Sequence, residues 1–323
     1  MKFRTMLLVL LPAVAGMAAL WSRAGADEWP PLHTRLAIST PQGNRECVIH
    51  VPVSCDRSRP NPLVIMLHGF GGTALNAAKE TGWSAQADQQ NFMIVYPEAT
   101  RPDRTRPANF RSNPQAWNDG SGRFHAAAER IDDVAFIETM IDRINNTWKV
   151  DADRIFVTGF SNGASMTFRL GAELPQRFAA IAPVAGTCWT EHVGPSPAVS
   201  LCYITGTADS LNPLDGGYPK LAFGGKEQGG QPKPPVQTFI DRWSSELNCP
   251  EQPRTDVMSG GVRRRTYGPG RQRSEILWIT VEELGHHWPG GQSQAPEFLV
   301  GKSSRKLRAT ETVWDFFKTH PKP

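Results

Sequence analysis

Three residue types that together support nucleophilic catalysis occur along the chain in the order Ser161, Asp209 and His286. A serine hydroxyl is a poor nucleophile until a base takes its proton, and a histidine can accept that proton and later pass it to the leaving group. A carboxylate orients the imidazole and stabilises its charged form. Each of the three residues follows a predicted buried strand, so all three are expected at the carboxyl edge of one parallel sheet. We therefore predict that Ser161 is the nucleophile, Asp209 the acid and His286 the base.

The serine lies in Gly159-Phe-Ser-Asn-Gly163, after an apolar run that begins at Ile155 and before a helix-forming segment at residues 164–174. This order of strand, sharp turn and helix is the one that presents a serine at the tip of a strained turn. The two glycines provide the small neighbours that such a turn needs. The pentapeptide alone is a weak signal, and its flanks and partners make it specific.

A glycine-rich turn, His68-Gly-Phe-Gly-Gly72, follows the apolar run at residues 63–67. Backbone N–H groups in such a turn can face a ligand. We expect the N–H groups of Phe70 and Asn162 to stabilise an oxyanion, and losing one such donor typically costs about 3–4 kcal/mol of transition-state stabilisation. The alternative is an ordinary strand-to-helix turn.

Several neighbouring residues compete for these roles. His287 projects in a different direction from His286, and we expect it to contact substrate instead. We expect His68 to be a structural loop histidine. Asp215 lies farther from the end of its strand than Asp209 does. A metal at the two adjacent histidines would lack identifiable third and fourth ligands, so no metal or cofactor is predicted.

The elements that must position these residues alternate between strand and helix. Buried strands are predicted at residues 63–67, 92–96, from 155, 178–186, 201–206 and 276–281, an outer strand at 45–53, and helices at 131–148, 164–174, 236–247 and 310–318. This alternation predicts an α/β fold with a mainly parallel, doubly wound sheet in a single domain. Residues 27–42 are expected to be a loose lead-in, Asp132 and Asp133 to be structural, and the arginine run at 263–265 to lie on a solvated edge.

Irregular loops at residues 101–124 and 221–235 are expected near the site. Trp117, Trp189 and Trp288 fall on predicted site-edge loops, and with His287 they are predicted to contact substrate. The alternative is that these tryptophans pack against their own neighbours.

The first residues have the features of a signal peptide. Lys2 and Arg4 precede an apolar run at residues 6–20, and Ala24-Gly-Ala26 is a small-x-small cleavage site. We expect residues 1–26 to be removed and residues 27–323 to form one secreted domain, extracellular or periplasmic. Cleavage would remove three basic residues and no acidic one, lowering the net charge from +4 to +1. Nothing in the remaining charge favours nucleic acid or a membrane.

Five cysteines are present: Cys47, Cys55, Cys188, Cys202 and Cys249. Disulfides are possible in an exported protein, although an odd number leaves at least one thiol unpaired if all pairing is internal. Cys202 lies in a predicted buried strand and is expected to be a free thiol. The pairing of the others stays open.

Taken together, the motifs make residues 45–320 similar to the secreted polyhydroxybutyrate depolymerase and feruloyl esterase-like group of α/β-hydrolases. The similarity rests on the serine and glycine-rich motifs above, together with Trp117-Asn-Asp-Gly120, Gly206-Thr-Ala-Asp209, Gly285-His-His-Trp-Pro-Gly290 and Ala309-Thr-Glu-Thr-Val-Trp-Asp-Phe-Phe317. The resemblance implies the α/β-hydrolase fold, places Ser161, Asp209 and His286 at the triad positions, and places Phe70 and Asn162 at the oxyanion positions. Phe70 stands where many relatives carry cysteine, and His287 stands where threonine is common.

The resemblance implies a serine esterase acting on a polyester or oligomer of the hydroxyalkanoate type, or on a feruloyl-type aromatic ester of the plant cell wall. A serine peptidase on the same fold, or an exported binding protein without catalysis, remains an alternative. The sequence leaves open the natural ester, the oligomeric state and whether the loops close over the site.

Overall fold

The computed structural model describes residues 29–191, 197–219, 232–293 and 295–323. The predicted signal peptide and most of the predicted loop at 221–235 lie outside these residues. Among the described helices, none has both the length and the apolar character required to cross a bilayer.

A single ten-stranded sheet forms the centre of the molecule, with the strand order β1-β2-β4-β3-β5-β6-β7-β10-β9-β8. The six strands from β4 to β10 in this order are mutually parallel, and an antiparallel hairpin extends the sheet at each edge. The strands are β1 (His33–Thr40), β2 (Gly43–His50), β3 (Asn61–Leu67), β4 (Met93–Pro97), β5 (Val150–Phe160), β6 (Ala180–Val184), β7 (Ser200–Gly206), β8 (Thr255–Ser259), β9 (Val262–Tyr267) and β10 (Ile276–Val281). The predicted fold class, an α/β fold with a mainly parallel sheet, is confirmed.

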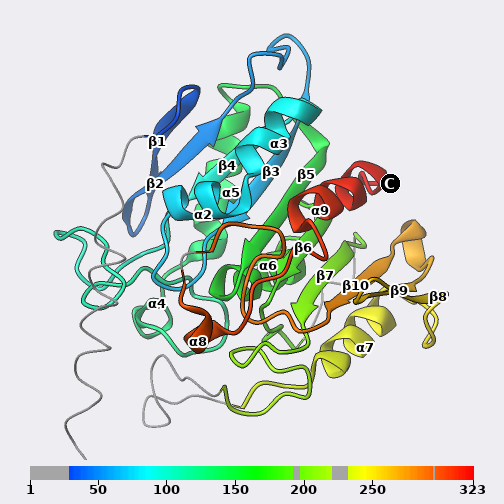
Figure 1. Ribbon diagram of the computed structural model, residues 1–323. Coiled ribbons are helices and arrows are strands. Elements are labelled where there is room, and N and C mark those ends of the chain that lie inside the picture. Colours follow the sequence, from blue (N-terminus) through cyan, green and yellow to red (C-terminus); the bar gives the residue numbers. More distant parts are fainter. Residues whose placement is uncertain (1–28, 192–196, 220–231, 294) are drawn as a thin grey trace, which may run out of the picture.

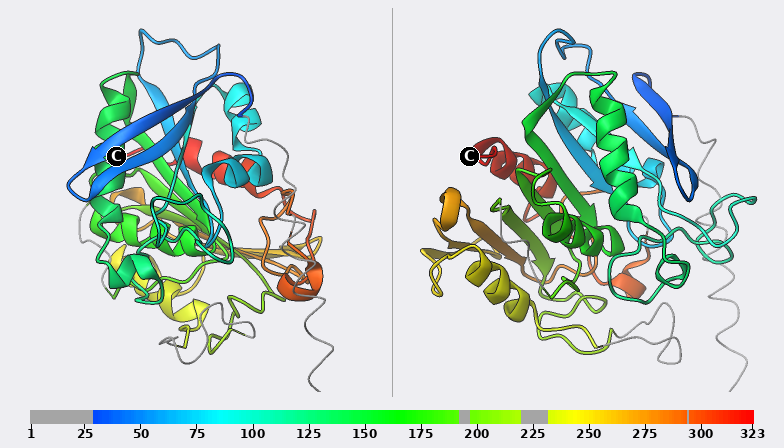
Figure 2. Two further views of the ribbon diagram at one scale, coloured as in Figure 1. Left: turned by 90° about the vertical axis from the view of Figure 1, so that its left-hand side faces the viewer. Right: turned by 180° about the vertical axis from the view of Figure 1, so that it is seen from behind.

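Helices cover both faces of the sheet, as the two views in Figure 2 show. One core lies beneath α5 (Asp133–Asn145), α6 (Asn162–Glu173) and α7 (Val236–Glu246). The other lies beneath α2 (Ala74–Thr81), α3 (Trp83–Gln90) and the C-terminal α9 (Ala309–Thr319). The short helices are α4 (His125–Ala128), the 3₁₀ turn η2 (Arg271–Arg273) and α8 (Glu297–Val300). Because each face is covered, β3, β4, β6 and β7 are buried along their whole length.

The topology brings distant parts of the sequence to one edge of the sheet. Strands β5, β6, β7 and β10 are neighbours in this order and run parallel. The segments that follow β5, β7 and β10 therefore meet at the carboxyl edge, although about 125 residues separate the first from the last.

Some local predictions are wrong at the sheet edges. Residues 33–40 are not a loose lead-in, because they form β1, which pairs with β2 along its full length. The arginine run lies on β9, which is covered at the sheet edge by β8, a strand that the sequence pattern did not predict. Arg263 pairs with Asp256 of β8, and Arg265 lies 4.0 Å from the ring centroid of Trp278. Pairing between strands stabilises these weakly apolar segments.

All five cysteines lie in the described residues and carry free thiols. Cys202 is fully buried in β7, as expected. Burial raises the pKa of its thiol to about 12, which keeps it protonated and unreactive at neutral pH.

Candidate active site

Ser161 lies in a sharp turn between β5 and α6. Its backbone has φ 56° and ψ −115°, in the left-handed half of the map that non-glycine residues rarely adopt. A bond from its N–H to the Val184 carbonyl, 3.0 Å, holds the turn against β6. A side chain at Gly159 or Gly163 would overlap neighbouring backbone, so the turn requires glycine at both places. Such strained serines are found where the hydroxyl must project from the end of a strand.

The hydroxyl of Ser161 lies 2.8 Å from Nε2 of His286. On the other side of the ring, Nδ1 lies 2.8 Å from a carboxylate oxygen of Asp209. The carboxylate accepts, so Nδ1 carries the proton and Nε2 is left to accept from the serine hydroxyl. The three predicted residues are thus brought into one line of hydrogen bonds, poised for proton transfer from serine to imidazole.

Asp209 is buried, and its two oxygens have separate partners. Oδ1 accepts from the backbone N–H groups of Leu211 and Asn212, at 2.9 and 2.8 Å, while Oδ2 accepts from His286. Burial alone would raise the pKa of this carboxyl, but the adjacent His286, the Asn212 N–H and the cation of Lys233 together hold that pKa below its usual value. The group therefore stays ionised where the imidazole needs a negative partner.

His286 is positioned by the loop after β10. Its backbone N–H donates to the carbonyl of Val300, and the ring of Phe160 packs against the imidazole with centroids 4.9 Å apart. His287 faces elsewhere: its Nε2 donates to the carbonyl of Gly301, 2.8 Å away, and burial lowers its pKa. His287 is buried and supports the loop, and its contact with substrate stays a prediction.

The glycine-rich loop after β3 lies directly against the serine. A side chain at Gly69 would come within 3.3 Å of the Cβ of Ser161, so the loop that carries Phe70 lies beside the turn that carries the serine. His68 stabilises this loop. Its Nε2 accepts from the Ala99 N–H at 3.1 Å, so its proton is on Nδ1, which donates to the Gly69 carbonyl at 2.8 Å. Burial lowers the pKa of His68, and it is a neutral structural histidine.

Trp117 connects the glycine-rich loop to the helix after the serine. Its indole N–H donates to the His68 carbonyl at 2.9 Å, and its backbone N–H donates to the side-chain oxygen of Asn162 at 2.8 Å. The ring is fully buried, so Trp117 supports the site from inside and does not form the predicted rim. Trp288 is also buried, and its indole N–H donates to the Thr310 hydroxyl at 3.0 Å. It therefore does not form the predicted rim either.

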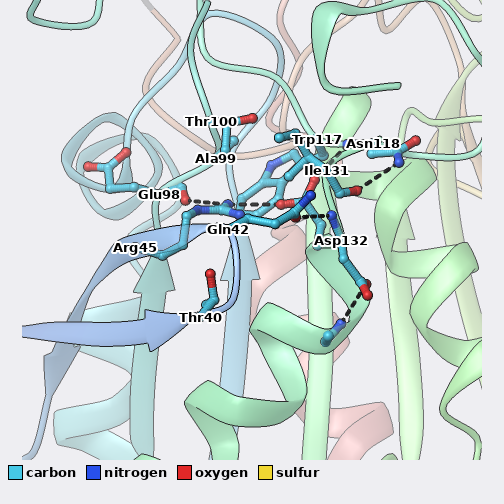
Figure 3. A network of polar contacts seen from close by, with 12 residues as sticks. Thr40, Gln42, Arg45, Glu98, Ala99, Thr100, Trp117, Asn118, Ile131 and Asp132 are labelled. Carbon is cyan, nitrogen blue, oxygen red and sulfur yellow. Dashed lines mark hydrogen bonds and ion pairs between the residues drawn. The ribbon is translucent and has the colours of Figure 1, made fainter. Parts of the chain in front are cut away.

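A buried ion pair supports the loop that carries Trp117, and Figure 3 shows its surroundings. Arg45 donates to Asp133 at 2.8 Å and to the Glu98 carbonyl at 3.0 Å, and its guanidinium lies 4.0 Å from the ring centroid of Phe136. The second oxygen of Asp133 accepts from the backbone N–H of Asn118 at 2.8 Å. Asp133 is therefore structural, as expected, and its partner comes from β2.

Asp132 has a different structural role from Asp133. Its side chain accepts from the Ala135 N–H at 2.9 Å and caps α5, and its own N–H donates to Gln42 at 2.7 Å. The two adjacent carboxylates thus fix the helix start and the loop separately.

An aromatic cluster borders the glycine-rich loop. The Phe70 ring stacks on Phe124 with centroids 4.8 Å apart, and the Arg123 guanidinium lies 5.0 Å from the ring centroids of both Phe124 and Trp189. These four side chains are half-buried. Trp189 is thus the one predicted tryptophan that retains partial exposure.

Sequence reasoning missed four polar residues of the site. Asp119 accepts from the Asn162 side chain at 2.8 Å and from Arg123 at 3.3 Å, while Asn212 and Lys233 lie behind Asp209. Asp119 stands inside the Trp117-Asn-Asp-Gly120 motif and Asn212 follows Asp209 by three residues, so their closeness to these motifs was the available signal. Across the described ranges, no group of three or more His, Cys, Asp or Glu side chains is arranged to hold a metal ion.

The pattern of the phospholipase/carboxylesterase family matches residues 49–218, more than half of the chain. The chain therefore belongs to this family, a group of esterases within the α/β-hydrolase superfamily. One relative, "Putative esterase NocK" of Nocardia uniformis subsp. tsuyamanensis, is 30% identical over 79% of this chain and 73% of its own length. Poly(3-hydroxyalkanoate) depolymerase C of Paucimonas lemoignei is 26% identical over 77% of this chain and 60% of its own length. Feruloyl esterase D of Neurospora crassa is 23% identical over 98% of this chain and 97% of its own.

Solved structures resemble this chain in fold. Acetyl xylan esterase from Aspergillus awamori superimposes with a TM-score of 0.53 at 16% identity, covering 79% of this chain and 94% of that one. At this level of identity, the similarity shows that the two chains share the α/β-hydrolase fold.

Proposed function

We propose that the protein is a secreted serine esterase in which Ser161, His286 and Asp209 form the catalytic triad. The observation that carries this proposal is the unbroken line of hydrogen bonds from the serine hydroxyl through the imidazole to the carboxylate, 2.8 Å at each step. The strained backbone of Ser161 and its place before the α6 N-terminus support the same role. Acyl transfer is the chemistry for which such a set is suited.

In the proposed reaction, Ser161 Oγ attacks the acyl carbon of the ester while its proton moves to His286 Nε2. The tetrahedral oxyanion is stabilised by the N–H groups of Phe70 and Asn162. When the intermediate collapses, the ester C–O bond breaks and the imidazolium gives its proton to the departing alcohol. Water then attacks the acyl-enzyme, with His286 again accepting a proton, and the carboxylic acid leaves with Ser161 restored.

The proposed substrates are carboxylic esters of two chemical kinds: polyester or oligomer of the hydroxyalkanoate type, and feruloyl-type aromatic esters. Relatives named for each kind match most of this chain, which supports the choice. The half-buried aromatic cluster at Phe70, Phe124 and Trp189 would provide an apolar contact for either acyl group. No cofactor is required by this reaction.

Hydrolysis of short and medium-chain p-nitrophenyl esters by the wild-type protein and by Ser161→Ala tests the proposal. We expect turnover in the wild type and its loss in the variant. Hydroxybutyrate oligomers compared with methyl ferulate then separate the two substrate kinds. Turnover of amides at rates comparable to those of esters with matched acyl groups would support a peptidase instead. Ligand binding without turnover, unchanged in Ser161→Ala, would support a binding protein.

Secretion is proposed from the leader at residues 1–26. Mass spectrometry of the exported protein should give a chain that begins at Asp27. Ala26→Arg, which places a large charged side chain at the cleavage site, should leave the leader attached. An exported wild-type chain that still begins at Met1 would contradict the proposed cleavage.

A further inference from the structure

A buried cation, Lys233, lies behind the acid of the site and has no part in the reaction described above. Its ammonium donates to the side-chain oxygen of Asn212 at 3.1 Å, and only 9% of the residue is exposed. Its backbone pairs in both directions with Gly217, at 2.9 and 3.0 Å, which fixes the point from which the side chain extends. A buried ammonium is costly, so a lysine held in this way calls for an explanation.

Asn212 links this lysine to the catalytic acid. Its side-chain oxygen accepts from Lys233 and from the Thr187 hydroxyl, the latter at 2.7 Å, and its amide nitrogen donates to the Tyr203 hydroxyl at 2.9 Å. Its backbone N–H donates to Asp209 Oδ1 at 2.8 Å. With every side-chain polar atom engaged, Asn212 has one position, and that position fixes one oxygen of the acid.

The charge of Lys233 acts on the same carboxylate. Besides Asn212, which accepts from it, the ammonium faces three charged groups, Arg123, Asp209 and Asp119. Burial and the nearby Arg123 lower the pKa of Lys233 to about 7, while the two carboxylates oppose this. In return, Lys233 helps to hold the pKa of Asp209 down.

We propose that Lys233 is a positioning residue for the esterase reaction: through Asn212 it fixes the Asp209 carboxylate against His286. This inference rests on the proposed function. Lys233 makes no contact with the serine or the imidazole, so its effect reaches the reaction through the acid.

Lys233→Met tests the proposal, because methionine removes the donor while filling similar space. For p-nitrophenyl butyrate we expect kcat to fall about tenfold, the usual effect of losing one hydrogen bond, with KM changed less than twofold. Lys233→Arg keeps a donor and should retain most of the wild-type kcat. Lys318→Met, on the exposed end of α9, is the matched control and should match the wild type.

A Lys233→Met enzyme with wild-type kcat would overturn the inference. A raised KM with unchanged kcat would also overturn it, since that would make Lys233 a substrate contact. If Lys233→Met does not fold, Lys233→Leu also lacks the donor and must show the same fall in kcat. Wild-type turnover by Ser161→Ala would contradict the esterase proposal itself, whereas loss of turnover in Ser161→Ala beside an unaffected Lys233→Met would contradict only the role of Lys233.

Discussion

The side-chain amide of Asn162 donates to the carboxylate of Asp119 at 2.8 Å, which joins the residue after the serine to a loop 43 positions earlier in the chain. Both groups are buried. The same amide has its oxygen bonded to the Trp117 N–H, so one side chain holds two points of that loop. The backbone N–H of Asn162 is one of the two proposed oxyanion donors. We therefore expect its direction to depend on the Asp119 carboxylate, which is bonded to the Asn162 side chain.

Asp119→Ala should loosen this connection. It leaves the Asn162 amide and the Arg123 guanidinium without their shared acceptor inside the protein, which costs about 1–3 kcal/mol of folding stability. Because small displacements of catalytic groups cause large losses of rate, we expect kcat to fall by as much as about a hundredfold. Thermal unfolding and p-nitrophenyl ester turnover measure the two effects.

The chain contains a matched control for this variant. Asp56 accepts from the N–H and hydroxyl of Ser58, as Asp119 does from Ser121, but Asp56 is exposed at the surface. Asp56→Ala should leave both stability and turnover close to the wild type. Equal losses in the two variants would mean that the local turn, and not the link to Asn162, accounts for the effect.

The buried pair of Arg45 and Asp133 offers a stability prediction. Asp133→Asn leaves a buried guanidinium without its counter-charge and should lower the free energy of unfolding by about 3–5 kcal/mol. Arg35 and Glu46 form an exposed pair on the neighbouring strands at 2.9 Å, so Glu46→Gln should change stability by at most about 1 kcal/mol. Urea denaturation followed by circular dichroism compares the two. Similar small losses would show that burial adds nothing to the Arg45 pair.

Much of this arrangement could be predicted from sequence because the deciding signals are local. The Gly-x-Ser-x-Gly turn needs its glycines within two residues of the serine, and Asp209 and His286 each follow an apolar run. The parallel sheet then brings them together. Continuous apolar runs such as β3 and β7 are predictable for the same reason, since strands covered on both faces carry no polar alternation.

The features that could not be predicted from the sequence depend on contacts between distant residues. Asp132 and Asp133 are adjacent carboxylates with no difference in local pattern, yet one caps a helix and the other pairs with Arg45, 88 residues away. The partly exposed strand β1 and the fully exposed β8 have little apolar signal of their own and form by pairing. Trp117 and Trp288 lie on loops near the site. Their indole N–H groups donate to the His68 carbonyl and to the Thr310 hydroxyl, and residue spacing in the sequence does not predict these contacts.

Replacing the proposed acid should disable proton transfer. In Asp209→Asn the amide would no longer hold His286 in the tautomer that accepts from serine, and we expect kcat to fall by about 10⁴. Asp215, the competing carboxylate in the sequence, is exposed, so Asp215→Asn should retain wild-type turnover. Steady-state kinetics at neutral pH decide between them, and a greater loss in Asp215→Asn would reverse the assignment.

The buried lysine also predicts how stability depends on pH. Folding lowers the pKa of Lys233 from 10.5 to about 7, because burial disfavours the ammonium. Between these values the unfolded chain keeps the proton that the folded chain has released, so the free energy of unfolding from this group rises with pH above about 7. Lys233→Met lacks this pH-dependent contribution to the free energy of unfolding. Its melting temperature relative to wild type should therefore be higher at pH 6 than at pH 9, as measured by differential scanning calorimetry in matched buffers. A relative melting temperature that is equal at both values, or higher at pH 9, would contradict the assigned burial of the charge.

The central claim is that Ser161 is an activated nucleophile. Its most direct test is reaction of the folded protein with an active-site-directed fluorophosphonate, followed by intact-mass and peptide mass spectrometry. We predict one phosphonyl adduct per chain, on the peptide that contains Ser161, and none in folded Ser161→Ala. A folded wild-type protein that forms no adduct, or an adduct of equal yield in Ser161→Ala, would contradict the account.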